Sequence, residues 1–257
     1  MIDPRAIIDP TAELDSSVEV GPFSVIGAGV QIDAGTWIGS HAVIKGPTRI
    51  GKNNRIYQFT SLGEIPQDKK YANEETRLEI GDGNEIREFC TMSRGTEQGG
   101  GITRIGDDNW IMSYTHFAHD CQVGNHTIFA NNASLAGHAI VEDHVILGGF
   151  SGVHQFCALG AHSFIAAGAI VLKDVPPFVM AAGGDGATAN GLNREGMKRR
   201  GFSPETMALL RKAYKILYRQ NLTLKAALLE LEKLREESKE VGQMIDFIQK
   251  SSRGIVR

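Results

Sequence analysis

The chain contains few of the features that mark a secreted or membrane protein. Its three cysteines, Cys90, Cys121 and Cys157, are odd in number and lack CxxC spacing, which favours a reducing compartment over a disulfide framework. No apolar run approaches the ~18 residues of a membrane span, and the N-terminal segment lacks the basic start and apolar stretch of a secretory signal. The net charge of −3 gives no general attraction for nucleic acid. We therefore expect a cytoplasmic protein with no membrane span and no nucleic-acid partner.

Aromatic residues are also scarce, whereas glycine is frequent. There are 11 Phe, 5 Tyr and 2 Trp against 30 Gly. This balance is typical of a slim core with many tight corners, so an internal repeat is the first feature to look for.

An aliphatic or large apolar residue recurs at every sixth position from Ile8 to Val171, with two gaps. A six-residue period does not match the 3.6 residues of a helical turn, but it fits short strands separated by regular corners. Stability would then come from stacking of successive coils, as in other repeat proteins. The series has three parts: Ile8, Leu14, Val20, Ile26, Ile32, Ile38, Ile44, Ile50, Ile56 and Leu62; Ile80, Ile86 and Met92; and Ile105, Ile111, Phe117, Val123, Phe129, Leu135, Val141, Leu147, Val153, Leu159, Ile165 and Val171.

Two polar segments interrupt the repeat, near residues 63–79 and 94–104. They are either tolerated surface insertions or loops that reach into a site on a rigid scaffold. The repeat domain should extend over residues 1–182.

The remaining chain, residues 183–257, is predicted to form a linker and an α-helical C-terminal domain. Gly183 to Gly191 is the expected linker. Ser203, followed by Pro204 and Glu205, is typical of a helix start. Thr223 is expected to cap a second helix that continues to about residue 238, and a third helix is predicted over 241–251.

Four histidines in the second half of the repeat form the clearest candidate for a chemical site: His116, His119, His138 and His154. For a coil of three hexads, His119, Gly137 and Gln155 lie in one column, because each follows the one before by three hexads. Adjacent coils are ~4.8 Å apart, so these side chains would gather closely. A neutral histidine can act as a general base near pH 7, with Asp120 or a backbone carbonyl holding its tautomer. Solvated corner histidines and a zinc site are the alternatives.

Several motifs resemble one family along the whole chain, including IYQFTSLGE, THFAHDC, ANNASLAGH, GVHQFC and NREGMKRRGF. The chain is similar to the acyl-(acyl-carrier-protein)–UDP-N-acetylglucosamine O-acyltransferases. The resemblance implies a mainly β protein, a left-handed parallel β-helix with three hexads per coil, followed by a small α-helical domain. It also implies transfer of an (R)-3-hydroxyacyl chain from acyl carrier protein to the 3-position of a UDP-amino sugar. This is the first step of lipid A biosynthesis, carried out by a homotrimer that needs no cofactor and no metal.

The resemblance also assigns roles to residues. It implies that His119 is the general base, next to Asp120, and that the Gly137 N–H stabilises the oxyanion. It implies an acyl-length position at Ala167. The substrate-binding residues that it implies are Asp68, Lys70, His116, His138, His154, Gln155, Asn193, Glu195, Arg199 and Arg200.

Two departures from the family pattern bear on the substrate. Ser93 stands where the family commonly has histidine, which leaves open the 3-amino analogue of the sugar nucleotide as acceptor. The segment before the tail, GGDGATANGLN, is longer than usual. Three other classes remain as alternatives: the later UDP-3-O-acylglucosamine N-acyltransferase, a metal-dependent enzyme of the carbonic anhydrase type, and a purely structural β-solenoid.

Overall fold

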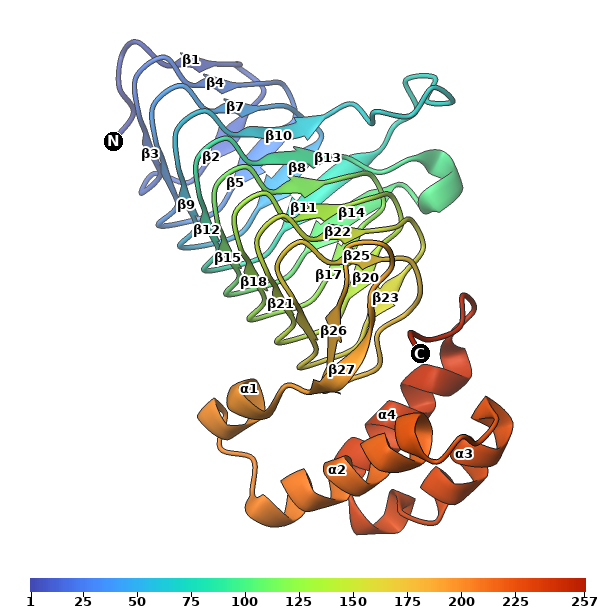
Figure 1. The fold of residues 1–257 in the computed structure, drawn as a ribbon. Coiled ribbons are helices and arrows are strands. Elements are labelled where there is room, and N and C mark those ends of the chain that lie inside the picture. The colour runs from blue at the N-terminus through green and yellow to red at the C-terminus, as the bar shows by residue number, and fades with distance from the viewer.

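Short parallel strands wind into a left-handed β-helix with three flat faces, and helices follow at its C-terminal end (Figure 1). This computed structural model describes residues 1–257. The fold predicted from the sequence is therefore confirmed.

Each face is one sheet whose neighbouring strands come from successive coils. The first face contains β1 (Ile7–Ile8), β4 (Val25–Ile26), β7 (Val43–Ile44), β10 (Ser61–Glu64), β13 (Thr91–Ser93), β16 (His116–Phe117), β19 (Ser134–Leu135), β22 (Gly152–Val153) and β25 (Ile170–Val171). The second contains β2 (Glu13–Leu14), β5 (Val30–Ile32), β8 (Thr48–Ile50), β11 (Arg77–Ile80), β14 (Ile102–Ile105), β17 (Gln122–Val123), β20 (Ile140–Val141) and β23 (Ala158–Leu159). The third contains β3 (Glu19–Val20), β6 (Trp37–Ile38), β9 (Arg55–Ile56), β12 (Glu85–Ile86), β15 (Trp110–Ile111), β18 (Ile128–Phe129), β21 (Ile146–Leu147), β24 (Phe164–Ile165), β26 (Val179–Ala182) and β27 (Thr188–Leu192).

The strand register reproduces the repeat in the sequence. Ile8 pairs with Ile26, three hexads later, and His116 pairs with Ser134 at the same interval. The aliphatic residue of each hexad points into the prism, where Ile44, for example, is fully buried. Burial of such a side chain contributes roughly 1.5–3 kcal/mol, so the stacked aliphatic residues hold the coils together.

The corners of the prism have a conformation that the six-residue period did not predict. Phe59, Phe89 and Tyr114 adopt left-handed backbone angles with φ of 62°, 60° and 65°. Their rings stack at 5.0 and 4.8 Å between centroids. The contacts between rings of successive coils favour a conformation that is costly for an isolated residue with a side chain.

Both interruptions of the repeat form loops that leave the prism on the same side (Figure 1). We call residues 65–76, between β10 and β11, the first loop, and residues 94–101, between β13 and β14, the second loop. They are shorter than predicted because β11 and β14 each begin before the position of the hexad residue. The second loop contains the short 3₁₀ turn η1 (Glu97–Gly99).

The linker predicted over residues 183–191 is wrong in part. Thr188–Leu192 forms β27, which pairs with β26 in an antiparallel arrangement. Phe164 of β24 pairs with Met180 of β26 at an interval shorter than three hexads, so the last coil falls out of the six-residue period. The six-residue period therefore gives no signal for this final hairpin.

The C-terminal helices pack below the last coils (Figure 1). They are α1 (Arg194–Arg199), α2 (Pro204–Arg219), α3 (Leu224–Glu232) and α4 (Lys239–Lys250), with the 3₁₀ turn η2 (Arg235–Glu237) between α3 and α4. Ser203 and Thr223 cap α2 and α3 as predicted. The second predicted helix is too long, since α3 ends at Glu232, and α1 was not predicted from the sequence. No helix is both long and apolar enough to cross a membrane.

Candidate active site

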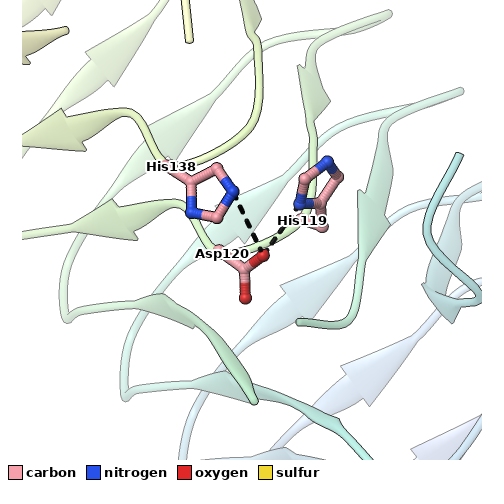
Figure 2. A group of neighbouring side chains, drawn as sticks. All are labelled: His119, Asp120 and His138. Carbon is pink, nitrogen blue, oxygen red and sulfur yellow. Dashed lines mark hydrogen bonds and ion pairs between the residues drawn. The ribbon is translucent and has the colours of Figure 1, made fainter. Parts of the chain in front are cut away.

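His119 and Asp120 form the centre of the candidate site, at the corner between the first and second faces (Figure 2). The His119 Nδ1 atom lies 2.8 Å from Oδ2 of Asp120. Asp120 is 3% exposed and has a left-handed φ of 62°. A carboxylate accepts the hydrogen from Nδ1, which leaves Nε2 as the basic nitrogen of a neutral His119. This is the arrangement that a general base requires.

His138 lies one coil further along the same corner and faces the same carboxylate (Figure 2). Its Nε2 is 3.7 Å from Oδ2 of Asp120, and its ring meets the His119 ring edge to face. Phe156 stacks on its other side at 4.4 Å between centroids. Burial lowers the pKa of His138, although the charge of Asp120 opposes this. His138 is therefore predominantly neutral near pH 7.

His116 lies at the start of β16, on the first face. Its Nδ1 is 2.7 Å from the Thr91 hydroxyl, one coil earlier. Burial, followed by the nearby His119, lowers the pKa of His116. It is thus a second neutral imidazole beside the central pair.

Gly137 packs directly against His119, as the spacing of three hexads predicted. A Cβ atom on Gly137 would lie 2.7 Å from Cε1 and 2.8 Å from Nε2 of His119, so this position has no room for a side chain. The N–H of Gly137 donates to no other group of the chain. By contrast, the N–H of Ala136 donates to the carbonyl of Val153, and the N–H of His138 donates to the carbonyl of His119. A free N–H beside a histidine can bind a developing oxyanion.

His116, His119 and Gly137 line a cleft of about 490 Å³ on the first face, whereas Asp120 and His138 do not line it. Its walls include residues that were not predicted from the sequence, because nothing in the six-residue period distinguishes them. Ser93, noted only as a departure from the family pattern, is also in the wall. The residues that line the cleft are Gln67, Ser93, His116, Ala118, His119, Ser134, Leu135, Ala136, Gly137, Gly152, Val153, His154, Ile170 and Leu172.

The other predicted substrate residues near this corner are distributed around the cleft. His154 is in its wall, and its exposed neighbour Gln155 is one coil beyond Gly137. Asp68 and Lys70 are in the first loop, where the Asp68 carboxylate accepts the N–H of Lys70 at 3.0 Å. The charge of Asp68 also reaches His138, whose pKa it raises slightly against the dominant effect of burial.

The predicted residues of the tail lie at a different corner, between the second and third faces. Arg200 Nη1 is 2.6 Å from Nδ1 of His144 there. Asn193 caps α1 through Gly196 and donates to the carbonyl of His162. Glu195 and Arg199 are exposed on α1. Within a single chain, these tail residues do not reach the cleft beside His119.

Ala167 lies at the remaining corner, between the third and first faces, just after β24. It is exposed, and its backbone packs over Gly148. It does not line the cleft beside His119 in the single chain.

A metal ion is the only alternative occupant that the central group suggests. One ligand atom each from His119, Asp120 and His138 lies within 4.8 Å of the others. The carboxylate is already engaged, because its oxygens accept hydrogen bonds from Thr96 and His119. The donor set is therefore better suited to hold a proton-transferring histidine than to surround an ion.

A hexapeptide β-helix with a histidine–carboxylate pair and a free N–H in one cleft defines a hexapeptide-type acyltransferase. Comparison with known protein families supports this class. Residues 102–137 match the family described as bacterial transferase hexapeptide (six repeats), and residues 174–256 match UDP N-acetylglucosamine O-acyltransferase, domain 2.

Curated relatives match over the full length. The acyl-(acyl-carrier-protein)–UDP-N-acetylglucosamine O-acyltransferase of Thiobacillus denitrificans is 58% identical, over 100% of this chain and 99% of its own. The enzyme of the same name from Herminiimonas arsenicoxydans is 56% identical, over 100% and 99%. The chain belongs to the acyl-(acyl-carrier-protein)–UDP-N-acetylglucosamine O-acyltransferase family.

Solved structures with the same fold include two UDP-N-acetylglucosamine acyltransferases. The Francisella novicida enzyme gives a TM-score of 0.98 at 42% identity, over 100% of this chain and 94% of its own. The Moraxella catarrhalis O-acyltransferase gives 0.96 at 48% identity, over 100% and 99%.

Proposed function

We propose that this chain transfers an acyl group from acyl carrier protein to a hydroxyl of UDP-N-acetylglucosamine, with His119 as general base. The observation that carries the proposal is the contact between His119, held by Asp120 at 2.8 Å, and Gly137, whose N–H is free. Membership of a family with this activity supports it, since the curated relatives are named for this donor and acceptor.

Each proton transfer and each bond change of the reaction can be assigned to a group in the site. Nε2 of neutral His119 takes the proton of the sugar hydroxyl as the sugar oxygen attacks the thioester carbonyl carbon. The oxyanion of the tetrahedral intermediate accepts a hydrogen bond from the Gly137 N–H. The carbon–sulfur bond then breaks, and the imidazolium returns the proton to the departing thiolate. The thioester is already activated, so the protein supplies position, proton transfer and charge stabilisation.

The finer assignments are part of the same proposal. The acyl chain is an (R)-3-hydroxyacyl chain, the acceptor is the sugar 3-position, and the reaction is the first step of lipid A biosynthesis. The buried Ser93 in the cleft wall keeps the 3-amino analogue as a second candidate acceptor. A serine is smaller than a histidine and leaves more room and fewer fixed partners beside the acceptor group.

A homotrimer is the proposed assembly. The predicted substrate residues lie at three different corners of one prism: His119 at the first, Arg200 beside His144 at the second and Ala167 at the third. They can meet a single substrate only if neighbouring copies contribute different corners to one cleft.

The cytoplasmic location also stays a prediction; it rests on three unpaired cysteines, which are buried as free thiols.

Mass spectrometry of products tests the proposal. Purified protein would be incubated with 3-hydroxyacyl carrier protein and either UDP-N-acetylglucosamine or its 3-amino analogue. Acylation of the first acceptor supports the O-acyltransferase assignment. Acylation of the analogue alone moves the acceptor but keeps the mechanism, whereas no product from either refutes the assignment.

A His119→Ala variant provides the matched mechanistic test. We expect it to lose turnover while retaining its fold and oligomer size, because the side chain lies in the cleft wall and is not one of the buried hexad residues of the core. Activity within about tenfold of the parent would show that His119 is not the general base.

A further inference from the structure

The second loop holds the carboxylate of Asp120 in place with two hydrogen bonds, in addition to the contact with His119. Thr96, 5% exposed, is 24 positions before Asp120 in the sequence. Its backbone N–H donates to Oδ1 at 2.8 Å, and its hydroxyl donates to Oδ2 at 2.6 Å. The hydroxyl therefore donates to the same oxygen that accepts from His119 Nδ1.

The rest of the loop is shaped around this contact. Thr96 caps the turn η1, and its hydroxyl also accepts the N–H of Gly99 at 3.2 Å. A Cβ atom on Gly99 would collide with the Asp120 carboxylate, so the turn can close over the carboxylate only with glycine at this position. Thr103, just after the loop, accepts the backbone N–H of Asp120 at 2.7 Å.

We propose that Thr96 is a positioning residue of the active site, which fixes the Asp120 carboxylate and thereby the orientation and tautomer of His119. Asp120 is buried, so no water substitutes for a lost donor on its carboxylate. A hydrogen bond to a charged group is among the stronger ones, so we expect its loss to lower the rate tenfold or more if the geometry of His119 depends on it. The second loop is then a functional part of the site and not a surface insertion. This inference rests on the proposed roles of His119 and Asp120.

The test is a double-mutant cycle with Thr96→Val, Asp120→Asn and their combination, assayed by mass-spectrometric product counting so that slow variants remain measurable. Valine keeps the shape and the backbone N–H and replaces the hydroxyl by a methyl group, so both the bond to Asp120 and the weaker one from Gly99 are lost. We expect Thr96→Val to lower kcat at least tenfold with KM for UDP-N-acetylglucosamine changed less than twofold. In the Asp120→Asn background the same change should cost less than threefold.

Two further variants exclude a merely structural effect. Thr96→Ser keeps the donor and should restore kcat to within about threefold of the parent, whereas Glu97→Ala, exposed in the same turn, should change nothing. If Thr96→Val does not fold, Thr96→Ala, which also lacks the hydroxyl, takes its place in the cycle. It should lower kcat in the parent and have little effect in the Asp120→Asn background.

The outcomes separate the two proposals. If Asp120→Asn lowers kcat but Thr96→Val does not, the inference about Thr96 is overturned alone. Equal losses from Thr96→Val in both backgrounds also overturn it, since Thr96 would then act independently of Asp120. If Asp120→Asn itself retains full kcat, the proposed catalytic pair is wrong, and the role of Thr96 is lost with it.

Discussion

Replacement of Gly137 by alanine tests the contact between successive coils at the active site. The added Cβ would lie 2.7 Å from Cε1 and 2.8 Å from Nε2 of His119. Non-bonded carbons prefer about 3.5–4.0 Å, so the ring or the backbone must move by about 1 Å. The backbone of Gly137 is not in the left-handed region, so alanine adds a collision but no strain in φ.

A displacement of about 1 Å at reacting groups can lower the rate roughly 100-fold, and loss of an oxyanion donor has a similar cost. We therefore expect Gly137→Ala to lower kcat about 100-fold. The effect on KM for UDP-N-acetylglucosamine should be small, because the change affects the reacting centre and not the predicted nucleotide contacts.

The assay is steady-state turnover with 3-hydroxyacyl carrier protein, together with the thermal unfolding midpoint. Gly184→Ala is the control, because its Cβ would meet only the Gly168 carbonyl oxygen, at 3.7 Å. It should retain full activity. A kcat for Gly137→Ala within threefold of the parent, with an unchanged midpoint, would refute the role given to this contact.

Three further predictions concern the site and the tail. Arg200→Ala should raise KM for the nucleotide sugar at least tenfold with little change in kcat, because a charge-assisted phosphate contact is lost; an unchanged KM would remove Arg200 from the site. Burial, followed by the nearby His144, lowers the pKa of His162 to about 4, against about 6.5 when unfolded. The unfolded chain therefore binds the proton more readily, so stability should be full above pH 6.5 and fall between pH 6.5 and 4. His162→Phe, which keeps the stacking on Phe178, should show a smaller drop in urea midpoint from pH 7.5 to pH 5 than the parent. An equal drop in both proteins would show that His162 does not cause the loss of stability. Dialysis against EDTA should leave turnover unchanged, whereas activity lost and restored by zinc would make His119, Asp120 and His138 a metal site.

The sequence by itself determined the architecture of the repeat. Each aliphatic hexad residue has to be buried, and a regular coil of short strands buries all of them. Both the three hexads per coil and the left hand came from the family resemblance, because the period is compatible with other coil sizes and with either hand. Once a coil has three hexads, the spacing in the sequence sets the register between coils and places Gly137 on His119.

Only the tertiary structure decided the features that depend on irregular segments. Thr96 reaches Asp120 because the second loop folds back over the corner, and the path of a glycine-rich loop is not encoded in any period. Strand β27 escaped the pattern because the last coil is shorter than three full hexads. Arg200 meets His144 through the packing of α1 against the prism, a contact between residues 56 positions apart that depends on how the tail docks.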